Sequence, residues 1–211
     1  IQQLFFIFVR IVTRIGIEMS FDPIELQQFA QEMKYRKSLN ELEYQLELLK
    51  TRAELENIDI AEKQVEIEKQ IADLKSQLPN NAISSLSFAK IIREIEKNKS
   101  ALQTLEVKKK DLAEDIYNRI KSEYNQNLAS ARKSFSLEIP KLKTYLKTVE
   151  PEIVKLTEKI EELKLRIELE ASQEYENLLK ETSNQKNQII GGKDAAKFLL
   201  GLLGDANFVL K

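Results

Sequence analysis

Apolar residues recur at alternating three- and four-residue spacings from about Asp22 to Thr182, almost without interruption. This spacing gathers apolar side chains on one face of an α-helix, because the helix completes a turn every ~3.6 residues. The 211 residues include only five Gly and four Pro, too little punctuation for many short strands. The pattern therefore predicts an all-α fold of long helices packed side by side.

The composition narrows the chemistry that such a chain can perform. Charged residues make up 32% of the chain, which is typical of long helices and coiled coils. Cysteine and histidine are both absent, which excludes disulfides, the usual zinc sites and Ser-His or Cys-His nucleophiles. The net charge of −1 lacks the basic excess of a nucleic-acid-binding protein. We expect no enzyme activity, no catalytic residues, no cofactor and no metal.

A well-formed helix start predicts the first helical arm, residues 22–78. Asp22 can cap the helix, Pro23 suits its first position, and Glu25 completes a capping box. A four-residue step after Ile60 shifts the phase of the apolar seam, as an insertion in a coiled coil does. The predicted seam residues of this arm are Leu39, Leu42, Leu46, Leu49, Ile60, Ile67, Ile71 and Leu74.

A second helical arm, residues 88–147, follows a predicted hairpin tip at 79–87, where Pro79 and two asparagines stop the first arm. Its predicted seam residues are Ile95, Leu102, Leu105, Leu112 and Ile116. The Lys108-Lys109-Lys110 run is followed by acidic residues and has no interleaved aromatics, so we interpret it as a solvated helix face.

Charge favours pairing of the two arms. Residues 22–78 carry 8 basic and 13 acidic residues, whereas 88–147 carry 14 basic and 8 acidic residues. Opposite charges beside an apolar seam favour this pairing over self-pairing of either arm. The sequence thus predicts an elongated antiparallel coiled-coil hairpin, residues 21–147, with arms of roughly 85 Å.

A third long helix is predicted over residues 148–182, with the seam residues Ile153, Leu156, Ile160 and Leu163. Pro151 fits either the first position of a new helix that folds back or a kink in one bent rod. The segment has 5 basic and 10 acidic residues, which favours folding back beside the basic second arm.

The C-terminal part is predicted to contain a polar linker, 183–194, with a turn at Gly191-Gly192, and a short apolar helix with its tail, 195–211. This helix is too short to span a bilayer. We expect it to dock at a subunit interface or on the coiled coil, with membrane contact as the alternative. The candidate contact residues are Phe198, Leu199, Leu202 and Leu203.

An apolar segment, residues 1–20, precedes the hairpin. The stretch from Leu4 to Ile17 is too short and too charged to span a membrane, and it is a poor secretory signal, which favours a cytoplasmic location. Three interpretations stay open: a helix that packs on protein, a membrane contact, or an extension without function in which residues 1–18 precede a natural start at Met19. The candidate contact residues are Phe5, Phe6 and Phe8.

These patterns favour a non-enzymatic structural or assembly protein, an oligomerising coiled-coil stalk, scaffold or adaptor. Its expected partners are further copies of itself or a larger protein assembly, and not nucleic acid. The alternative is a membrane-surface binding or remodelling protein that uses its apolar terminal helices. In the order of its elements, an apolar N-terminal helix before a long charged hairpin, the chain resembles the PspA/ESCRT-III-like and BAR proteins, which implies that alternative.

Overall fold

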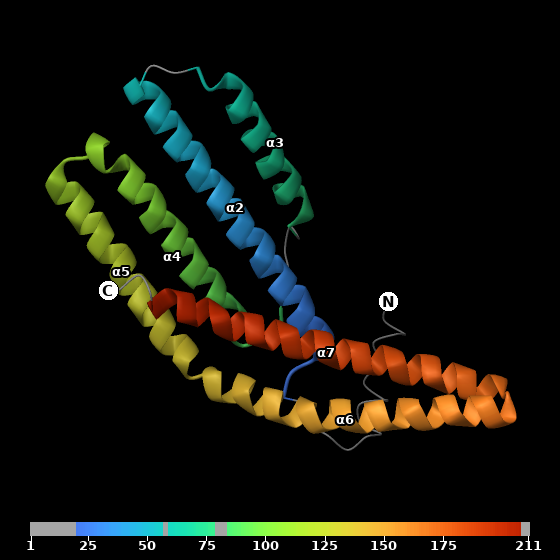
Figure 1. Cartoon of the computed structure of the whole chain (residues 1–211). Helices are drawn as coiled ribbons and strands as arrows, with labels where there is room; N and C mark the ends of the chain where they lie inside the picture. Colours follow the sequence, from blue (N-terminus) through green and yellow to red (C-terminus); the bar gives the residue numbers. More distant parts are fainter. Residues whose placement is uncertain (1–19, 57–58, 79–83, 208–211) are drawn as a thin grey trace. The chain divides into compact units, whose positions relative to one another are not determined.

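The structure is a computed structural model that describes residues 20–56, 59–78 and 84–207, with side chains through Leu202. Within these ranges the chain forms helices and no strands, which confirms the all-α class (Figure 1). The elements are α2 (Pro23–Glu56), α3 (Ala61–Gln77), α4 (Ala89–Val107), the 3-10 helix η1 (Lys108–Asp111), α5 (Glu114–Ser136), α6 (Ile139–Glu170) and α7 (Gln173–Asn207).

The described residues divide into two compact units, which we treat separately. The α2–α5 unit comprises residues 28–139 and the end of α7 from Phe198. The α6–α7 unit comprises residues 20–27 and 140–197. Each unit is built on helical hairpins, but their turns differ from those that the sequence predicts.

The start of α2 shows the capping chemistry that its sequence predicts. The Asp22 carboxylate accepts a hydrogen bond from the Ile24 amide at 2.8 Å. The Leu26 amide donates to the Asp22 carbonyl at 3.0 Å, which closes the first helical turn. Pro23 is the first helical residue, where its missing N–H costs nothing.

The expected continuous arm over 22–78 is interrupted in the structure. α2 ends at Glu56, and α3 returns antiparallel to it, with Lys75 Nζ 2.9 Å from Glu43 Oε1. The buried residues of this α2–α3 hairpin are Leu39, Leu46 and Ile71, with Leu42, Ile67, Leu74 and Leu78 packed against them. The phase step near Ile60 therefore marks a turn, because folding back lets the two parts of the seam bury each other.

The second expected arm, 88–147, is also divided. α4 ends at Val107, η1 makes the turn, and α5 runs back antiparallel to α4. The rings of Phe88 and Phe135 meet edge to face at 5.9 Å near one end of this α4–α5 hairpin. Near the other end, the Tyr117 hydroxyl donates to the Glu106 carboxylate at 2.7 Å.

The two hairpins of the α2–α5 unit join through α2 and α4, which run parallel. The Phe29 and Phe88 rings are 6.0 Å apart, and further along Lys108 Nζ lies 3.7 Å from Glu47 Oε2. The helices thus follow the spatial order α3, α2, α4, α5 (Figure 1). The acidic first half of the hairpin region does contact the basic second half, but as parallel helices rather than as the two arms of one hairpin.

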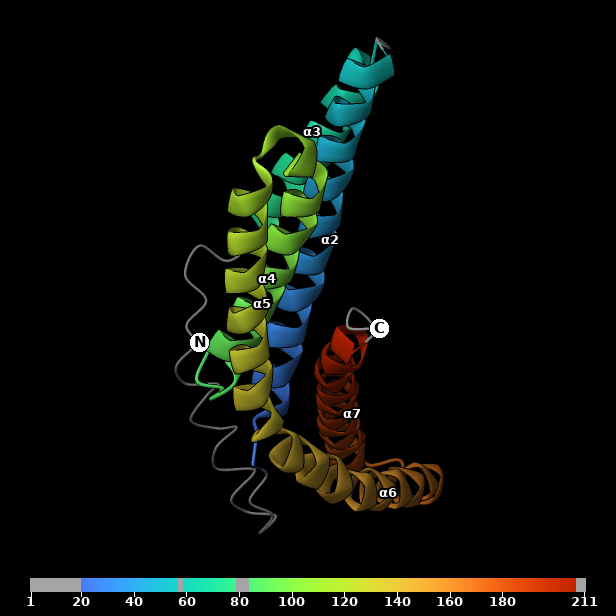
Figure 2. The ribbon, with the colours of Figure 1, turned by 90° about the vertical axis from the view of Figure 1, so that its left-hand side faces the viewer.

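In the α6–α7 unit, α6 and α7 form an antiparallel hairpin (Figures 1 and 2). The chain turns at residues 171–172, within the predicted third helix of 148–182, whereas Pro151 lies inside α6. Ala171 has a positive φ of 45°, and its amide donates to the Ile167 carbonyl at 2.9 Å, which closes the end of α6. The predicted linker 183–194 is part of α7, since its polar residues continue the helix.

The predicted turn at Gly191-Gly192 is wrong, because both glycines lie inside α7. A side chain at Gly192 would place its Cβ 2.7 Å from Pro23 Cβ and 2.8 Å from Pro23 Cα, a backbone atom that cannot move aside. Glycine is needed here so that α7 can approach the first turn of α2. The Gln27 amide completes the contact by donating to the Gln188 carbonyl at 2.9 Å.

We predict that Gly192→Ala lowers the free energy of unfolding by about 1–2 kcal/mol, because overpacking outweighs the helix propensity of alanine. Gly201 is the matched control, since it lies in the same helix with no atom within 4 Å of an added Cβ. Gly201→Ala should raise stability by about 0.5–1 kcal/mol. Urea denaturation of both variants measures the difference, and stabilisation by Gly192→Ala would refute the close contact.

We predict that Leu46→Asp costs about 2–4 kcal/mol, because Leu46 is 9% exposed in the α2–α3 core and a carboxylate there finds no partner. Its neighbour Gln45 is exposed, so Gln45→Asp should cost about 0.5 kcal/mol or less. Thermal or chemical unfolding of the two variants tests the register of α2. Equal losses at both positions would show that Leu46 does not face α3.

Candidate functional site

The most structured polar site in the described chain is a buried carboxylate between α2 and α4. The side chain of Glu32, on α2, is 3% exposed. Arg93, on α4, donates from Nε to Glu32 Oε1 and from Nη2 to Glu32 Oε2, both at 2.7 Å. Arg36, one turn further along α2, donates to Oε1 at 2.7 Å. Two guanidinium groups therefore hold both carboxylate oxygens.

A series of aromatic rings begins next to this ionic cluster. Phe29, Phe88 and Phe135 are almost fully buried and meet edge to face in series across α2, α4 and α5. The Arg93 guanidinium carbon lies 5.2 Å from the centre of the Phe29 ring, within the range of a cation–π contact. The Glu32 side chain is 3% exposed, so water has little access to its carboxylate, which strengthens these hydrogen bonds.

These contacts determine the pKa of Glu32. Burial alone raises the pKa of the carboxyl group, but the hydrogen bonds and positive charges of Arg93 and Arg36 outweigh it, so the pKa lies below its ordinary value of 4.5. The hydrogen bonds from Arg93 to Glu32 raise the pKa of the guanidinium. Glu32 is thus held ionised as a hydrogen-bond acceptor, a structural role rather than that of a proton donor.

A groove of about 460 Å³ lies beside the cluster, between α2 and α4. Its apolar floor includes Leu39 and Ala101, and its lining includes the cationic side chains Arg36, Lys90, Arg93 and Lys97. Two carboxylates, Glu94 and Glu96, also line it, and Lys99 Nζ lies 3.2 Å from Glu96 Oε1. Basic side chains therefore outnumber acidic ones around this groove.

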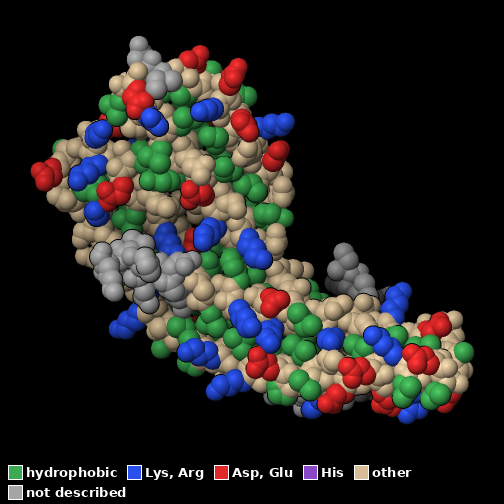
Figure 3. Space-filling model, in the orientation of Figure 1, with side chains coloured by type: hydrophobic (Ala, Val, Ile, Leu, Met, Phe, Trp, Pro, Cys, Tyr) green, Lys and Arg blue, Asp and Glu red, His purple; other side chains and the backbone are tan. Residues whose placement is uncertain are grey.

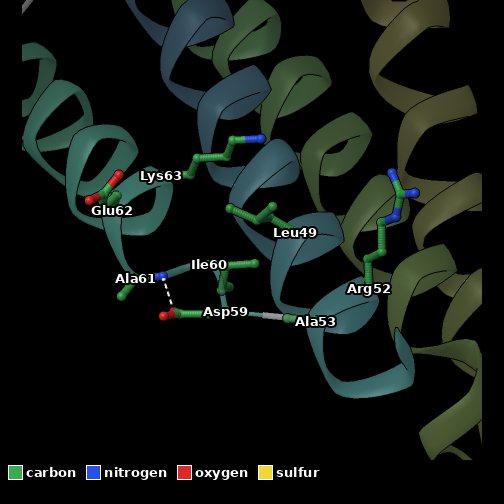
Figure 4. Close-up of a pocket in the computed structure, with 8 residues that line it drawn as sticks. All are labelled: Leu49, Arg52, Ala53, Asp59, Ile60, Ala61, Glu62 and Lys63. Atoms are coloured by element: carbon green, nitrogen blue, oxygen red, sulfur yellow. Dashed lines mark hydrogen bonds between the residues drawn. The ribbon is translucent and has the colours of Figure 1, made fainter. Parts of the chain in front are cut away.

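A second hollow, also of about 460 Å³, opens at the turn between α2 and α3 (Figure 4). Asp59 accepts a hydrogen bond from the Ala61 amide at 3.0 Å at the start of α3. The charged side chains around it do not converge: Lys63 extends toward α2, Glu62 points away, and Arg52 extends from another side of α2 (Figure 4). This arrangement is a surface hollow without a focused set of ligand-binding groups.

The predicted seam residues are mostly covered by helix–helix contacts. The buried ones are Leu39, Leu46, Ile71, Ile95, Leu105, Leu156 and Leu163. The half-buried ones are Leu42, Leu49, Ile60, Ile67, Leu74, Leu102, Leu112, Ile153 and Ile160. Ile116 is 36% exposed, whereas Tyr117 is buried, because α5 restarts after η1 and the seam changes phase there. Coiled-coil geometry stays a prediction.

The candidate contact residues near the C-terminus are largely covered by the chain itself. Leu199 and Leu202 are buried, and Phe198 is half-buried with Lys34 Nζ 5.3 Å from its ring centre. Lys99 Nζ donates to the Leu202 carbonyl at 3.5 Å. The side chain of Leu203 lies outside the described residues, as do Phe5, Phe6 and Phe8.

Sequence reasoning missed the buried ionic cluster. The available signal was a charged residue on an apolar face: Glu32 lies between Phe29 and Met33, both buried, with Arg36 one turn away. A carboxylate at such a position needs a cationic partner from another helix. That the partner is Arg93 depends on the parallel pairing of α2 and α4, which the sequence pattern does not indicate.

Comparison with known proteins gives no relative: no protein-family model, curated protein or solved structure matches the chain. Among the described residues, no helix is both long and apolar enough to cross a membrane. The same part of the chain contains no cluster of three or more acidic side chains arranged to hold a metal ion.

We predict that Glu32→Gln lowers the free energy of unfolding at neutral pH by about 2–3 kcal/mol, because charge-assisted hydrogen bonds are lost inside the protein. The pKa of Glu32 is lowered on folding, so its contribution is complete above the ordinary pKa of 4.5 and is lost as pH falls through the lower folded value. The stability difference between wild type and variant should therefore shrink below about pH 4.5, as measured by denaturant titration at several pH values.

Glu162→Gln is the matched control for this prediction. Glu162 also accepts hydrogen bonds from an arginine one turn away, Arg166, at 2.7 and 2.8 Å, but the pair is exposed. Its loss should change stability little, because water replaces the contact. Equal effects of the two substitutions would show that burial of Glu32 does not increase the contribution of its ion pairs to the free energy of unfolding.

Proposed function

We propose that the chain is a non-enzymatic structural or assembly protein that associates with copies of itself through its helical hairpins. The supporting observation is that α6 carries apolar side chains on two opposite sides. Leu142, Val149, Leu156 and Leu163 are buried on the first side. The second side carries Val154, Leu165 and Leu169, which are 56%, 56% and 75% exposed.

The positions of these residues along α6 separate the two sides. Each residue advances about 100° around a helix, which places the exposed group almost diametrically opposite the buried one. A helix that packs on one neighbour needs a single apolar face. The second face of α6 supports a further helical partner beyond its own hairpin.

Other helices also expose apolar side chains. Leu55 and Val65, near the turn of the α2–α3 hairpin, are each 65% exposed, and Leu137 at the end of α5 is 73% exposed. Charged side chains lie among the hydrophobic ones on the visible surface (Figure 3). Single exposed apolar side chains are common on protein surfaces, so the proposal rests on the second apolar side of α6 rather than on these residues.

The energetics favour an assembly built from several contacts. Full burial of a leucine side chain gains about 1.5–3 kcal/mol, so the exposed face of α6 supplies only part of an affinity. A stable protein interface buries roughly 800 Å² on each partner. Several hairpin faces would therefore combine, which suits a scaffold or stalk whose strength comes from repetition.

We predict that the full chain sediments above its monomer mass of 24.5 kDa, in a concentration-dependent manner. Replacing Leu165 and Leu169 together by Ser should lower that mass while the helix content, followed by circular dichroism, stays unchanged. The control replaces Lys159 and Lys164, exposed on the same helix but roughly 100–120° around it from Leu165, by Ser. It should leave the mass unaltered.

Two outcomes would contradict this proposal. A monomer at every concentration would remove self-association. Flotation with liposomes that requires residues 1–18, with no change of mass in solution, would instead favour the membrane-surface function. The first experiment needs only purified chain, and the second adds a variant that begins at Met19.

A further inference from the structure

The tip of the α6–α7 hairpin is acidic and partly apolar. Residues 167–179 contain four glutamates and no lysine or arginine. The adjacent Arg166 lies 5.8 Å from the centre of the Tyr175 ring and is paired with Glu162. All four are exposed: Glu168, Glu170, Glu174 and Glu176. Leu165 and Leu169 stand beside them with more than half of their surface exposed. The tip therefore offers exposed apolar side chains together with four exposed carboxylates.

The position of two of these carboxylates is unfavourable for the isolated helix. Glu168 and Glu170 lie in the last turn of α6, which has no basic residue. The C-terminal end of a helix carries partial negative charge, so cations are preferred there and carboxylates are disfavoured. Glu174 and Glu176, in the first turn of α7, are at the favoured end. A cationic partner would relieve the unfavourable charge at the end of α6.

The groove between α2 and α4 has the complementary character. Leu39 and Ala101 are its apolar lining residues. Its exposed charged side chains are Lys90, Lys97 and Glu94, so positive charge is in excess. Its volume of about 460 Å³ accommodates a few side chains but not a whole helix. The size suits an apolar side chain such as Leu169 with carboxylates at its edge.

We propose that the α6–α7 tip of one copy docks into the groove between α2 and α4 of a second copy, with Leu169 on the apolar floor and the tip glutamates beside Lys90 and Lys97. This inference rests on the proposed self-association and names its surfaces. Two tips repel each other, because each carries four negative charges, so a symmetric tip-to-tip contact is disfavoured. Tip-to-groove contact joins different surfaces and produces a ring or an open chain of copies.

Engineered cysteines test the contact directly, since the natural sequence has none. One chain carries Leu169→Cys and another carries Ala101→Cys, so that a disulfide between them joins two copies. Mixing the two with oxidised glutathione, which accepts the two electrons of the thiols, should produce the mixed dimer at least about tenfold faster than mixing Leu169→Cys with Leu55→Cys, the control at another exposed leucine. High salt should slow the specific reaction more than the control reaction.

Charge reversal provides a second test of the contact. Glu168→Lys with Glu170→Lys in the tip chain should slow the mixed disulfide, and so should Lys90→Glu with Lys97→Glu in the groove chain. Both pairs of residues are exposed, so folding is preserved and can be checked by circular dichroism. Combining the two reversals should restore the original rate, which a general effect of charge on the reaction would not do.

The outcomes separate this inference from the proposed function. A monomeric wild type overturns self-association and this contact with it. An oligomer whose mixed disulfide forms no faster than the control, or is not restored by the combined reversal, overturns the tip-to-groove contact alone. A chain carrying both cysteines that closes its disulfide internally, while the mixed pair stays unreacted, shows that the occupant is the chain's own tip and also overturns it.

Discussion

The contact between Glu32 and Arg93 sets the arrangement of the α2–α5 unit. Apolar seams can hold α2 against α3 and α4 against α5, but a seam alone leaves two hairpins free to slide past one another. A carboxylate that is 3% exposed cannot leave its guanidinium partners without a large desolvation penalty. One residue on each of α2 and α4 therefore fixes the parallel register that the Phe29–Phe88 contact also requires.

Apolar and ionic contacts have different tasks in this chain. Leu39, Leu46 and Ile71 supply area inside one hairpin, where many leucine registers would bury a similar surface. The ionic contacts select among them, because a bidentate arginine–carboxylate pair tolerates little displacement. The contact between Lys108 and Glu47, toward the far end of α2, favours the same register more weakly, since both groups are partly exposed. The exposure of each ion pair thus determines how much it contributes to stability.

The all-α class and the start of α2 could be predicted because both depend on local sequence: apolar spacing and a capping aspartate. The turns could not. The apolar spacing showed only a four-residue phase step near Ile60, which also fits a locally unwound continuous coiled coil, so periodicity alone did not show that the chain reverses before α3. Pro151 fitted either the start of a new helix or a kink in a continuous one, and helix continues on both sides of it. The Gly191-Gly192 pair looked like a turn, but its small size serves a close contact with Pro23, which no local pattern contains. Ala171 makes the actual turn without a glycine.

The difference between local patterns and contacts of distant residues also explains why the candidate surfaces could be predicted only in part from the sequence. Blocks of net charge were evident, but the structure decides which block is already matched within the chain. Part of the acidic first half meets the basic second half through Glu32 and Glu47. The acidic block at the end of α6 lies in a helix turn that contains no basic residue and beside leucines that stay exposed. A charge that opposes its own helix dipole and adjoins uncovered apolar surface is more readily explained by a partner than by folding stability. The surfaces that hold the hairpins together therefore differ from those available to join one copy to the next.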